Sequence, residues 1–511
     1  MANQYIDLNT LRFQLYDVHQ VEKLLSYERF QDHDRQSMDI FLDAVKDFSD
    51  KEAFPYFREM DEKPVVYKDG KVMVHPQIET IMKKCGEMGL IGADFDYDEG
   101  GVQLPGTVSN AAYFILDAAN NNISGYPGLT LGAAKLILSY GSDSLKEKYV
   151  PNMLSGKWGG TMCLTEPQAG SSLSDITTSA SPNEDGSYKI KGQKIFISGG
   201  DNQFTENFVH LVLARIEGAP AGTKGISLFV VPKKRLLEDN SLESNDVLTA
   251  GDFQKLGQRG YATVHLVFGE NDNCNGWLIG EAHKGLKCMF QMMNGARISV
   301  GRHGAGIATA AYHASLQYAQ ERPQGRPLSN GGKKDLTQGQ TLIIKHPDVR
   351  RMLMLQKAVS EACLSIVLQS SIYHDLETVS EGADKAHYNL LLEMLTPITK
   401  TYPSEMGRVS VNNGVQVLGG YGFCSEFVLQ QYYRDIRIMA IYEGTTGIQS
   451  LDLLGRKVVG QNGKGLKVFS KEIQATIEAA SNFDDLKPYG DVLIEKLQVN
   501  QKILGFLVPF A

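Results

Sequence analysis

A single carboxylate inside a short glycine- and threonine-rich segment is the residue best suited to move a proton. Glu443 stands between the ring of Tyr442 and the turn residues Gly444 and Thr445. Apolar neighbours raise the pKa of a carboxylate, and a raised pKa makes it a usable proton acceptor near neutral pH. The alternative is a helix N-terminus, with Glu443 facing the helix dipole and Thr445 as the cap. The segment alone leaves both interpretations open.

A second segment ends a predicted strand in a loop that carries hydroxyls and bare backbone N–H groups. It runs from Met162 to Ser172 and contains Glu166, Pro167 and Gly170. Loops of this kind suit the heteroatoms of a flat cofactor or a phosphoryl group. An ordinary hairpin loop is the alternative.

Two further segments could contact a large cofactor. Residues 194–200 form a predicted strand with an aromatic face at Phe196 and a hydroxyl at Ser198. Residues 416–423 are glycine-rich, and glycines let the backbone and a ligand come close. The alternative for Phe196 is a buried side chain in the core of a sheet.

The four segments, taken in their order along the chain, resemble those of the acyl-CoA dehydrogenase family, and the resemblance covers about residues 85 to 456. The resemblance implies that Glu443 removes the α-proton of an acyl-CoA, giving a trans-2-enoyl-CoA, while N5 of FAD accepts the β-hydride. It also implies that the backbone N–H of Glu443 and a ribityl hydroxyl polarise the thioester oxygen. Some members carry the base just before the residue equivalent to Arg297, where this chain has Ala296. We therefore expect Glu443 to be the base.

The resemblance also assigns contacts residue by residue. Family members commonly have Trp where Phe196 stands, Thr where Ser198 stands and Asp where Ser172 stands. Arg297 is expected on the CoA side of the pocket and Arg322 at the flavin pyrophosphate across a subunit interface, with surface arginines as the alternative. No metal site is expected. The expected FAD contacts are Leu164, Thr165, Gly170, Ser171, Phe196, Ser198, Arg322, Gln416, Gly419, Gly420 and Thr445, and the expected substrate contacts are Ser171, Arg297, Tyr442 and Gly444.

Composition narrows the function classes. The 51 Lys and Arg against 59 Asp and Glu give a net charge of −8, which argues against broad nucleic-acid binding. The 6 cysteines form no Cys-x-x-Cys pair, which is typical of an intracellular protein without a zinc site. The N-terminus resembles no secretory signal, and no apolar run approaches the roughly 18 residues of a membrane span. We expect a cytoplasmic homodimer or homotetramer that passes electrons to an electron-transferring flavoprotein or a similar acceptor.

Hydrophobic periodicity predicts a mostly α, α+β chain in four parts. Residues 1–158 indicate an N-terminal helical domain, 159–283 a small β-barrel or sandwich domain, 284–470 a four-helix bundle, and 471–511 the start of a further helical extension. Pro397 is expected to interrupt and kink a bundle helix. Residues 304–310 mimic a dinucleotide fingerprint but follow no strand, so close helix packing explains their small side chains better.

Other functions share part of this evidence. The insertion after Arg322 and the segment Leu395-Thr396-Pro397 resemble the branch that contains 3-methylmercaptopropionyl-CoA dehydrogenases. An acyl-CoA oxidase would carry the same flavin motifs and differ in the reaction of reduced flavin with oxygen. A non-catalytic or DNA-associated homologue would carry a strongly basic tail, whereas residues 482–487 are mixed to acidic.

Overall fold

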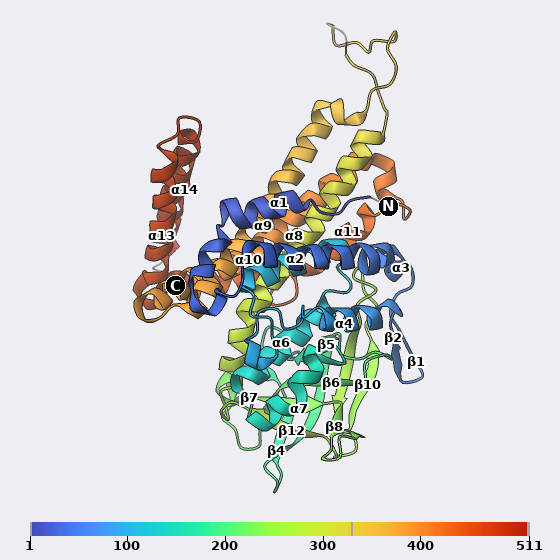
Figure 1. Ribbon diagram of the computed structural model, residues 1–511, viewed down its shortest axis with the longest axis vertical. Helices are drawn as coiled ribbons and strands as arrows, with labels where there is room; N and C mark the ends of the chain where they lie inside the picture. The colour runs from blue at the N-terminus through green and yellow to red at the C-terminus, as the bar shows by residue number, and fades with distance from the viewer. Residues whose placement is uncertain (1–2, 329–330, 508–511) are drawn as a thin grey trace.

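The computed structural model describes residues 3–328 and 331–507, which form a helical part, a β-sheet part and a second helical part in chain order (Figure 1). The sheet lies at one end of the molecule, and the long helices extend away from it. The first part comprises α1 (Leu8–Arg12), α2 (Arg35–Phe48), α3 (Phe57–Glu62), α4 (Gln77–Glu87), α5 (Gly106–Ala119), α6 (Gly125–Tyr140) and α7 (Asp143–Leu154), with a hairpin of β1 (Val66–Lys68) and β2 (Lys71–Met73).

Capping and apolar spacing explain the start of this part. The Asp34 carboxylate accepts a hydrogen bond from the backbone N–H of Ser37, and the Ser37 hydroxyl accepts one from the Asp34 N–H, so α2 begins with a capping box. Its buried positions recur at helical spacing, as predicted. Residues 21–26 form a 3₁₀-helix, and Asp61 lies in the last turn of α3.

The middle part is an eight-stranded sheet with the order β10-β11-β5-β12-β7-β6-β3, and β4 pairs with both β5 and β6. Most neighbours are antiparallel, whereas β6 runs parallel to β3 and to β4. The strand predicted from residue 194 is the second half of a longer strand, β5. The bounds are β3 (Trp158–Cys163), β4 (Ser179–Pro182), β5 (Tyr188–Ser198), β6 (Asn207–Ile216), β7 (Ile226–Pro232), β10 (Val247–Asp252), β11 (Thr263–Phe268) and β12 (Asn275–Ile279), and a separate hairpin joins β8 (Lys234–Leu236) to β9 (Leu242–Ser244).

Three long helices dominate the second helical part: α8 (Gly285–Glu321), α9 (Pro347–Val379) and α10 (Gly382–Leu418). They pack against one another, and α5 packs against α8 and α9. The expectation that Pro397 interrupts its helix is wrong, because α10 continues through Pro397 and Pro403. Gly304 of α8 lies against the Pro403 backbone, where a Cβ would be 3.0 Å from its carbonyl oxygen, so its small size serves helix packing as predicted.

Helix α9 is the one helix in the described part of the chain whose length and composition would allow it to cross a membrane. Half of its most apolar stretch is buried inside the protein. It packs against both α8 and α10, and its buried face carries the polar side chains Gln356, Ser360 and Asp375. These contacts are those of a core helix in a bundle.

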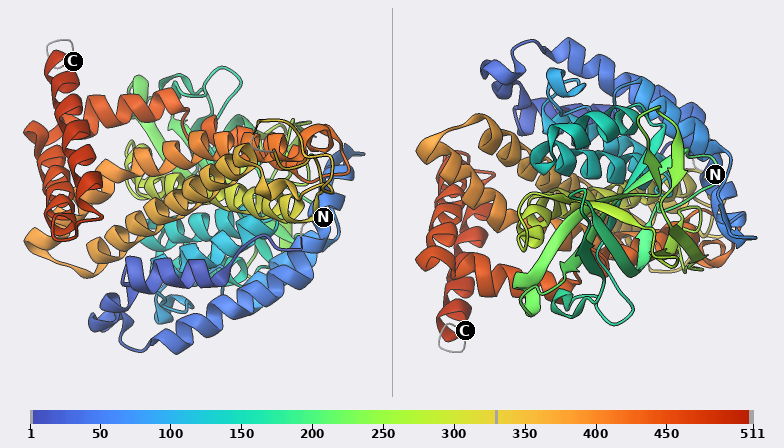
Figure 2. Two further views of the ribbon diagram at one scale, coloured as in Figure 1. Left: turned by 90° about the horizontal axis from the view of Figure 1, so that it is seen from above. Right: turned by 90° about the horizontal axis from the view of Figure 1, so that it is seen from below.

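The remaining elements are α11 (Leu429–Asp435), α12 (Thr446–Asp452), α13 (Gly460–Ala480) and α14 (Lys487–Leu507). Helices α13 and α14 form a pair that stands at one side of the molecule, away from the sheet (Figure 2). Helix α13 begins at Gly460, before the predicted start of the helical extension at residue 471, and residues 508–511 lie outside the described residues. The described residues of the segment after α8, 323–328 and 331–345, are mostly irregular, with bridges from Pro323 to Leu342 and from Leu328 to Lys334.

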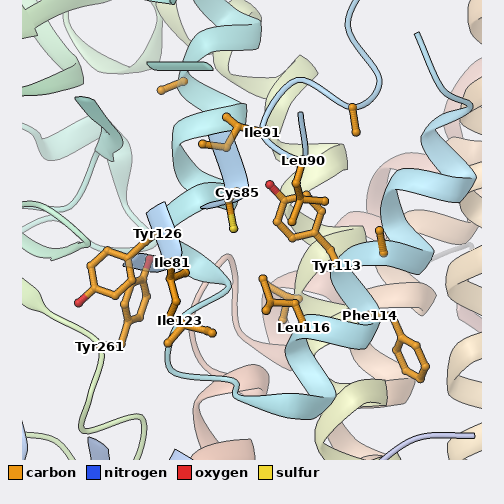
Figure 3. Close-up of a cluster of buried hydrophobic side chains, with 14 of the residues drawn as sticks. Ile81, Cys85, Leu90, Ile91, Tyr113, Phe114, Leu116, Ile123, Tyr126 and Tyr261 are labelled. Atoms are coloured by element: carbon orange, nitrogen blue, oxygen red, sulfur yellow. The ribbon is translucent and has the colours of Figure 1, made fainter. Parts of the chain in front are cut away.

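A continuous apolar core joins the first helical part to the sheet (Figure 3). Side chains of α4 and α5 meet those of residues 120–126 and of Tyr261, which lies just before β11. The rings of Tyr126 and Tyr261 pack edge to face with centroids 4.7 Å apart. This core fixes the position of the sheet relative to the long helices, and the residues discussed next lie around that junction.

Candidate active site

Glu443 lies in a left-handed turn immediately before α12. Its φ is 51°, and Gly444 follows with a φ of 86°. Thr445 caps α12 by accepting a hydrogen bond from the Ile448 N–H at 3.2 Å, so the capping interpretation is right for Thr445. Two successive left-handed residues make a tight turn that favours glycine at the second position. The turn sets the direction in which the Glu443 side chain leaves the backbone.

Side chains from two helices hold this turn. The Lys400 ammonium, on α10 and fully buried, donates a hydrogen bond to the Gly444 carbonyl oxygen at 2.7 Å. The Gln449 amide, on α12, donates to the carbonyl oxygens of Glu443 at 2.9 Å and of Gly444 at 3.3 Å. Both carbonyls of the turn are therefore satisfied by side chains, which leaves the Glu443 carboxylate out of the bonding that fixes its backbone.

The charges around Glu443 act in opposite directions on its protonation. Burial raises the pKa of Glu443, and the positive charges of Lys400 and Arg297 partly offset the rise. Burial also lowers the pKa of Lys400 to about 8, against the attraction of Glu443 and Glu405. Arg297, on α8, is itself buried and forms a 2.6 Å ion pair with Asp452. The result is a carboxylate whose affinity for protons is higher than that of a free glutamate.

A buried tyrosine connects this turn to the sheet. The Tyr261 hydroxyl is buried and has no hydrogen-bond partner among the described residues. Burial and the neighbouring Tyr126, Tyr442 and Glu443 raise the pKa of Tyr261 well above its usual value. The same hydroxyl would lie 3.5 Å from a Cβ built on Gly199, the residue after β5. The end of β5 and the Glu443 turn therefore face one polar atom without a protein partner.

The two flavin segments expected in the sheet lie side by side. The Ile195 N–H donates to the Thr165 carbonyl oxygen at 2.9 Å, and the buried Lys194 ammonium donates to the Leu164 carbonyl oxygen at 3.0 Å. The loop after β3 is thereby joined to the middle of β5. Thr165 and Leu164 are both partly exposed, so their side chains can contact a ligand.

Glu166 is the anchor of this loop. Its carboxylate forms a buried 2.8 Å ion pair with Lys194 and accepts hydrogen bonds from the backbone N–H groups and hydroxyls of Thr177 and Thr178. Burial alone would raise the pKa of Glu166, but Lys194 and the threonine donors outweigh it and hold the pKa at about 2. The loop is therefore held by an ionised carboxylate beneath it.

The aromatic ring of Phe196 is exposed and could contact a ligand. Its side chain is 56% exposed, although it belongs to a central strand, and its φ is 57°. The pairing of β5 with β11 shifts register near this point, between Val264 and Leu266. The alternative of a buried core side chain is therefore wrong for Phe196. Its ring contacts that of Phe253 at 4.4 Å and leaves the rest of its surface open.

The tip of the loop after β3 is open. Gly170 and Ser171 are exposed, and a Cβ on Gly170 would meet no atom within 4 Å. Ser172, which stands where the family commonly has Asp, donates its hydroxyl hydrogen bond to the Asp175 carboxylate. The carboxylate that family members commonly carry at position 172 is thus supplied to the same loop by Asp175, three residues later.

Arg322, Gln416, Gly419 and Gly420 form a second group of expected FAD contacts. Arg322 ends α8 and lies over the ring of Tyr421 at 5.5 Å, beside the exposed residues Gly419 and Gly420. Gln416 lies on α10 about 24 Å beyond Lys400 by the rise of an α-helix. No hydrogen bond, ion pair or ring contact between described residues joins this group to Phe196.

Comparison with known proteins identifies the origin of this arrangement. Family models match residues 36–157 as the N-terminal domain, 161–270 as the middle domain and 333–458 as the C-terminal domain of acyl-CoA dehydrogenase. A 3-methylmercaptopropionyl-CoA dehydrogenase from Ruegeria pomeroyi is 38% identical over 89% of this chain and 76% of its own length. The chain belongs to the acyl-CoA dehydrogenase family.

Two further relatives agree with this assignment. A broad-specificity linear acyl-CoA dehydrogenase from Mycobacterium tuberculosis is 34% identical over 98% of this chain and 82% of its own length. The solved structure of an acyl-CoA dehydrogenase with FAD from Bacillus anthracis superposes with a TM-score of 0.69 at 25% identity, over 88% of this chain and 71% of the other. Acyl-CoA dehydrogenases are FAD-dependent oxidoreductases that act on CH–CH groups.

The residues of this chain fit an FAD in the family manner. The exposed Phe196 ring, the open edge at Leu164 and Thr165, and the unpartnered Tyr261 hydroxyl provide an apolar face and polar atoms for a flat heterocycle. Among the described residues, no cluster of three or more metal-ligating side chains is present. These exposed and unpartnered groups are compatible with a flat cofactor such as the flavin of FAD.

Arg297 departs from its expected role. The surface alternative is wrong, because the side chain is 4% exposed and paired with Asp452. This burial and pairing do not fit the expected contact with CoA phosphate either. In this acyl-CoA dehydrogenase, Arg297 is instead buried, and its charge lowers the pKa of Glu443.

Sequence reasoning missed Lys400, Gln449 and Tyr261. A lysine within a predicted helix is expected to be exposed to solvent. No local sequence pattern around Lys400 indicates that it is buried. Gln449 and Tyr261 gave no signal of their own either. Gly257 lies against the Arg434 backbone, where a Cβ would be 2.5 Å from the carbonyl carbon, so it has a structural role.

A polar cavity of about 250 Å³ lies elsewhere, between α3, the Arg259 loop and residues 425–434. None of the expected FAD or substrate contacts lines this cavity. Its arginines are countered by neighbouring acids, including the Asp61 partner of Arg434. The cavity therefore plays no part in the site described above.

Proposed function

We propose that Glu443 is the base of an FAD-dependent α,β-dehydrogenation of an acyl-CoA to its trans-2-enoyl-CoA. The supporting observation is the turn itself: a partly buried carboxylate with a raised pKa and no side-chain donor on it among the described residues. A carboxylate that no protein group neutralises is free to accept a substrate proton. The reaction class is that of the family to which the chain belongs.

The chain's own residues support each requirement of that reaction. Lys400 and Gln449 hold the turn, so the Glu443 N–H and carboxylate keep a fixed relation to each other. A backbone N–H can stabilise negative charge that develops on a thioester oxygen. Entry of an acyl chain excludes water and raises the pKa of the Glu443 carboxyl group further. The difference between this pKa and that of the substrate's α-C–H group becomes smaller, so proton transfer is easier. The bound FAD supplies the hydride acceptor.

The two separated groups of expected FAD contacts favour a homo-oligomer. Leu164, Thr165, Phe196 and Ser198 lie at the sheet, whereas Arg322, Gln416 and the glycines that follow it lie at the far ends of α8 and α10. We propose that the second group contacts the adenine half of an FAD bound by a neighbouring protomer. A homodimer or homotetramer, with an electron-transferring flavoprotein or a similar protein as acceptor and a cytoplasmic location, completes this proposal.

The substrate we propose is a short or linear acyl-CoA, including short thioether chains. This rests on the named activities of the relatives, which act on 3-methylmercaptopropionyl-CoA and on linear acyl-CoA. Arg297, Lys400 and Asp452 are buried charged residues around Glu443. A long unbranched acyl chain that extended among them would make unfavourable contacts, which argues for a short chain.

An anaerobic titration tests the proposal directly. FAD-loaded protein is mixed with short, long and thioether acyl-CoAs, and loss of the oxidised flavin absorbance is followed. We expect wild type to be bleached by at least one class and Glu443→Gln to bind FAD and ligand with at least a thousandfold slower bleaching. Full activity of Glu443→Gln would remove Glu443 from the mechanism. Rapid reoxidation of the reduced enzyme by oxygen would instead favour an acyl-CoA oxidase.

A further inference from the structure

We propose that Lys400 is a positioning residue of this reaction, which fixes the Glu443–Gly444 turn and holds the Glu443 carboxylate ionised from a distance. The inference rests on the proposed function, because it concerns the residue assigned there as the base. It adds a residue that acts through Glu443 and does not itself contact substrate.

The turn requires support from outside its own segment. A non-glycine residue at a φ of 51° is disfavoured, and Glu443 is followed directly by a second left-handed residue. Such a conformation persists when the surroundings over-determine it. The Lys400 ammonium bonds the Gly444 carbonyl oxygen at 2.7 Å, and the Gln449 amide bonds that of Glu443 at 2.9 Å. Lys400 is the holding group that comes from α10, and it therefore ties the turn to the bundle.

The ammonium is near the carboxylate without forming an ion pair with it. In the described part of the chain, neither Glu443 nor Glu405 lies within ion-pairing distance of the Lys400 nitrogen. A direct ion pair would occupy the carboxylate oxygen that must accept the substrate proton. By bonding a backbone carbonyl instead, Lys400 places a full positive charge in the buried interior beside the base and leaves the base free.

The charge of Lys400 is the less compensated of the two positive charges facing Glu443. Arg297 shares its charge with Asp452 at 2.6 Å, whereas Lys400 faces Glu443 and, one turn further along α10, the half-buried Glu405. Glu405 in turn accepts a hydrogen bond from the Thr446 hydroxyl at 2.7 Å. Interactions between charges are strong where water is excluded. Removal of the lysine charge should therefore favour the protonated, inactive form of Glu443.

Two single substitutions separate the effect of the Lys400 charge from that of its hydrogen bond to the Gly444 carbonyl oxygen. Lys400→Gln keeps a donor for the Gly444 carbonyl and removes the charge, whereas Lys400→Arg keeps both. The first readout is the pH midpoint of the Glu443 carboxyl carbon in ligand-free protein, followed by NMR with carboxyl-¹³C glutamate and assigned by its absence in Glu443→Gln. The second is the acidic limb of the pH profile of flavin reduction.

We expect Lys400→Gln to move both the NMR midpoint and the acidic limb upward by about one pH unit. Lys400→Arg should keep both near wild type even where the rate itself falls, because the positive charge remains. Equal midpoints in wild type and Lys400→Gln would overturn the inference and leave Lys400 a purely structural group. Full activity of Glu443→Gln would instead overturn the base assignment, and this inference with it.

A third variant decides the matter where the lysine variants do not fold. Glu405→Gln keeps an acceptor for the Thr446 hydroxyl and removes a negative charge that faces Lys400. Since Glu405 favours the charged form of Lys400, its neutralisation should move the alkaline limb of flavin reduction to lower pH. An unchanged alkaline limb would contradict a role for the lysine charge.

Discussion

At the scale of single residues, the ion pair between Glu166 and Lys194 supports the proposed flavin face from below. Both side chains are essentially without exposed surface, and each belongs to one of the two segments that resemble flavin contacts. A buried carboxylate stripped of its cation keeps its desolvation cost and loses the compensating charge. The pair therefore joins the stability of the sheet to the position of Thr165 and Phe196.

We expect Lys194→Met to lower the stability of the protein by about 3–5 kcal/mol and to weaken FAD binding. The double variant Glu166→Gln with Lys194→Met should recover a large part of that loss, because no unpaired charge remains. Urea unfolding and FAD fluorescence titration of the wild type, both single variants and the double variant measure the coupling. Additive effects of the two substitutions would show that the pair carries no coupling energy.

Gly444 is the second residue whose substitution separates geometry from chemistry. Its φ of 86° disfavours any side chain, and a Cβ would be 2.6 Å from the Gln449 amide nitrogen. We expect Gly444→Ala to slow flavin reduction at least tenfold without loss of bound FAD, since the turn that carries Glu443 must shift. Gly447→Ala is the matched control, because its nearest contact would be 3.8 Å away and Ala favours a helix. Equal rates for both alanine variants would argue against a geometric requirement at Gly444.

At the scale of elements, helix α5 begins with a cap supplied by another helix. Pro105 precedes α5 and offers no side-chain hydrogen bond, and the Asp375 carboxylate of α9 accepts from the N–H groups of Gly106 and Thr107 at 2.8 and 2.9 Å. The Thr107 hydroxyl donates to the same carboxylate at 2.6 Å. A buried helix N-terminus needs such partners, because its first N–H groups have none within the helix. The contact therefore joins the first helical part to the bundle.

Substitutions at this cap should lower the free energy of unfolding by an amount that depends on how many hydrogen bonds they remove. We expect Asp375→Ala to lower the free energy of unfolding by about 2–4 kcal/mol, since it leaves buried donors without a partner. Thr107→Val removes only the hydroxyl bond and should cost about 1 kcal/mol. Thermal unfolding of the three proteins measures the order. A loss from Thr107→Val equal to that from Asp375→Ala would show that the backbone donors find other partners.

Elements with strong local patterns were predictable from the sequence, and those fixed by distant contacts were not. The strand predicted from residue 194 is the end of β5, and the small residues Gly304 and Gly306 lie in close helix contacts, as expected from the sequence. Pro397 gave a wrong expectation, because contacts of α10 with α8, α9 and α13 override the local preference of proline. The motif around Glu443 named the candidate base, whereas Lys400 approaches it from another helix and leaves no trace in the local sequence.

At the scale of the whole molecule, Asp435 ties the three parts together. Its carboxylate accepts a hydrogen bond from the Gln258 N–H of the sheet part at 2.6 Å and from the Asn121 amide of the first helical part at 3.1 Å. The preceding residue, Arg434, forms an ion pair with Asp61 of α3 and donates to the Leu256 carbonyl oxygen. The junction lies eight residues before Glu443 in the chain, so it helps to set where the base stands relative to the sheet.

This junction should make the stability of the protein depend on pH. Burial, with a smaller contribution from Asp61, raises the pKa of Asp435 to about 7, against the donors Gln258 and Asn121 and the charge of Arg434. The folded protein then holds a proton that the unfolded chain releases near its ordinary pKa of about 3.8. The contribution is fully present below that pH and is lost as pH rises through 7, by on the order of 4 kcal/mol.

Asp435→Asn removes this pH dependence while it keeps the contacts. The new amide can accept from Gln258 and donate to the Asn121 carbonyl oxygen, which has no partner in the present structure, once the Asn121 amide rotates. We expect the variant to gain several degrees in unfolding temperature relative to wild type at pH 8 and little at pH 5, measured on FAD-saturated protein. The same difference at both pH values would mean that Asp435 is ionised throughout. In that case the Arg434 charge and the two donors, rather than burial, would govern the junction.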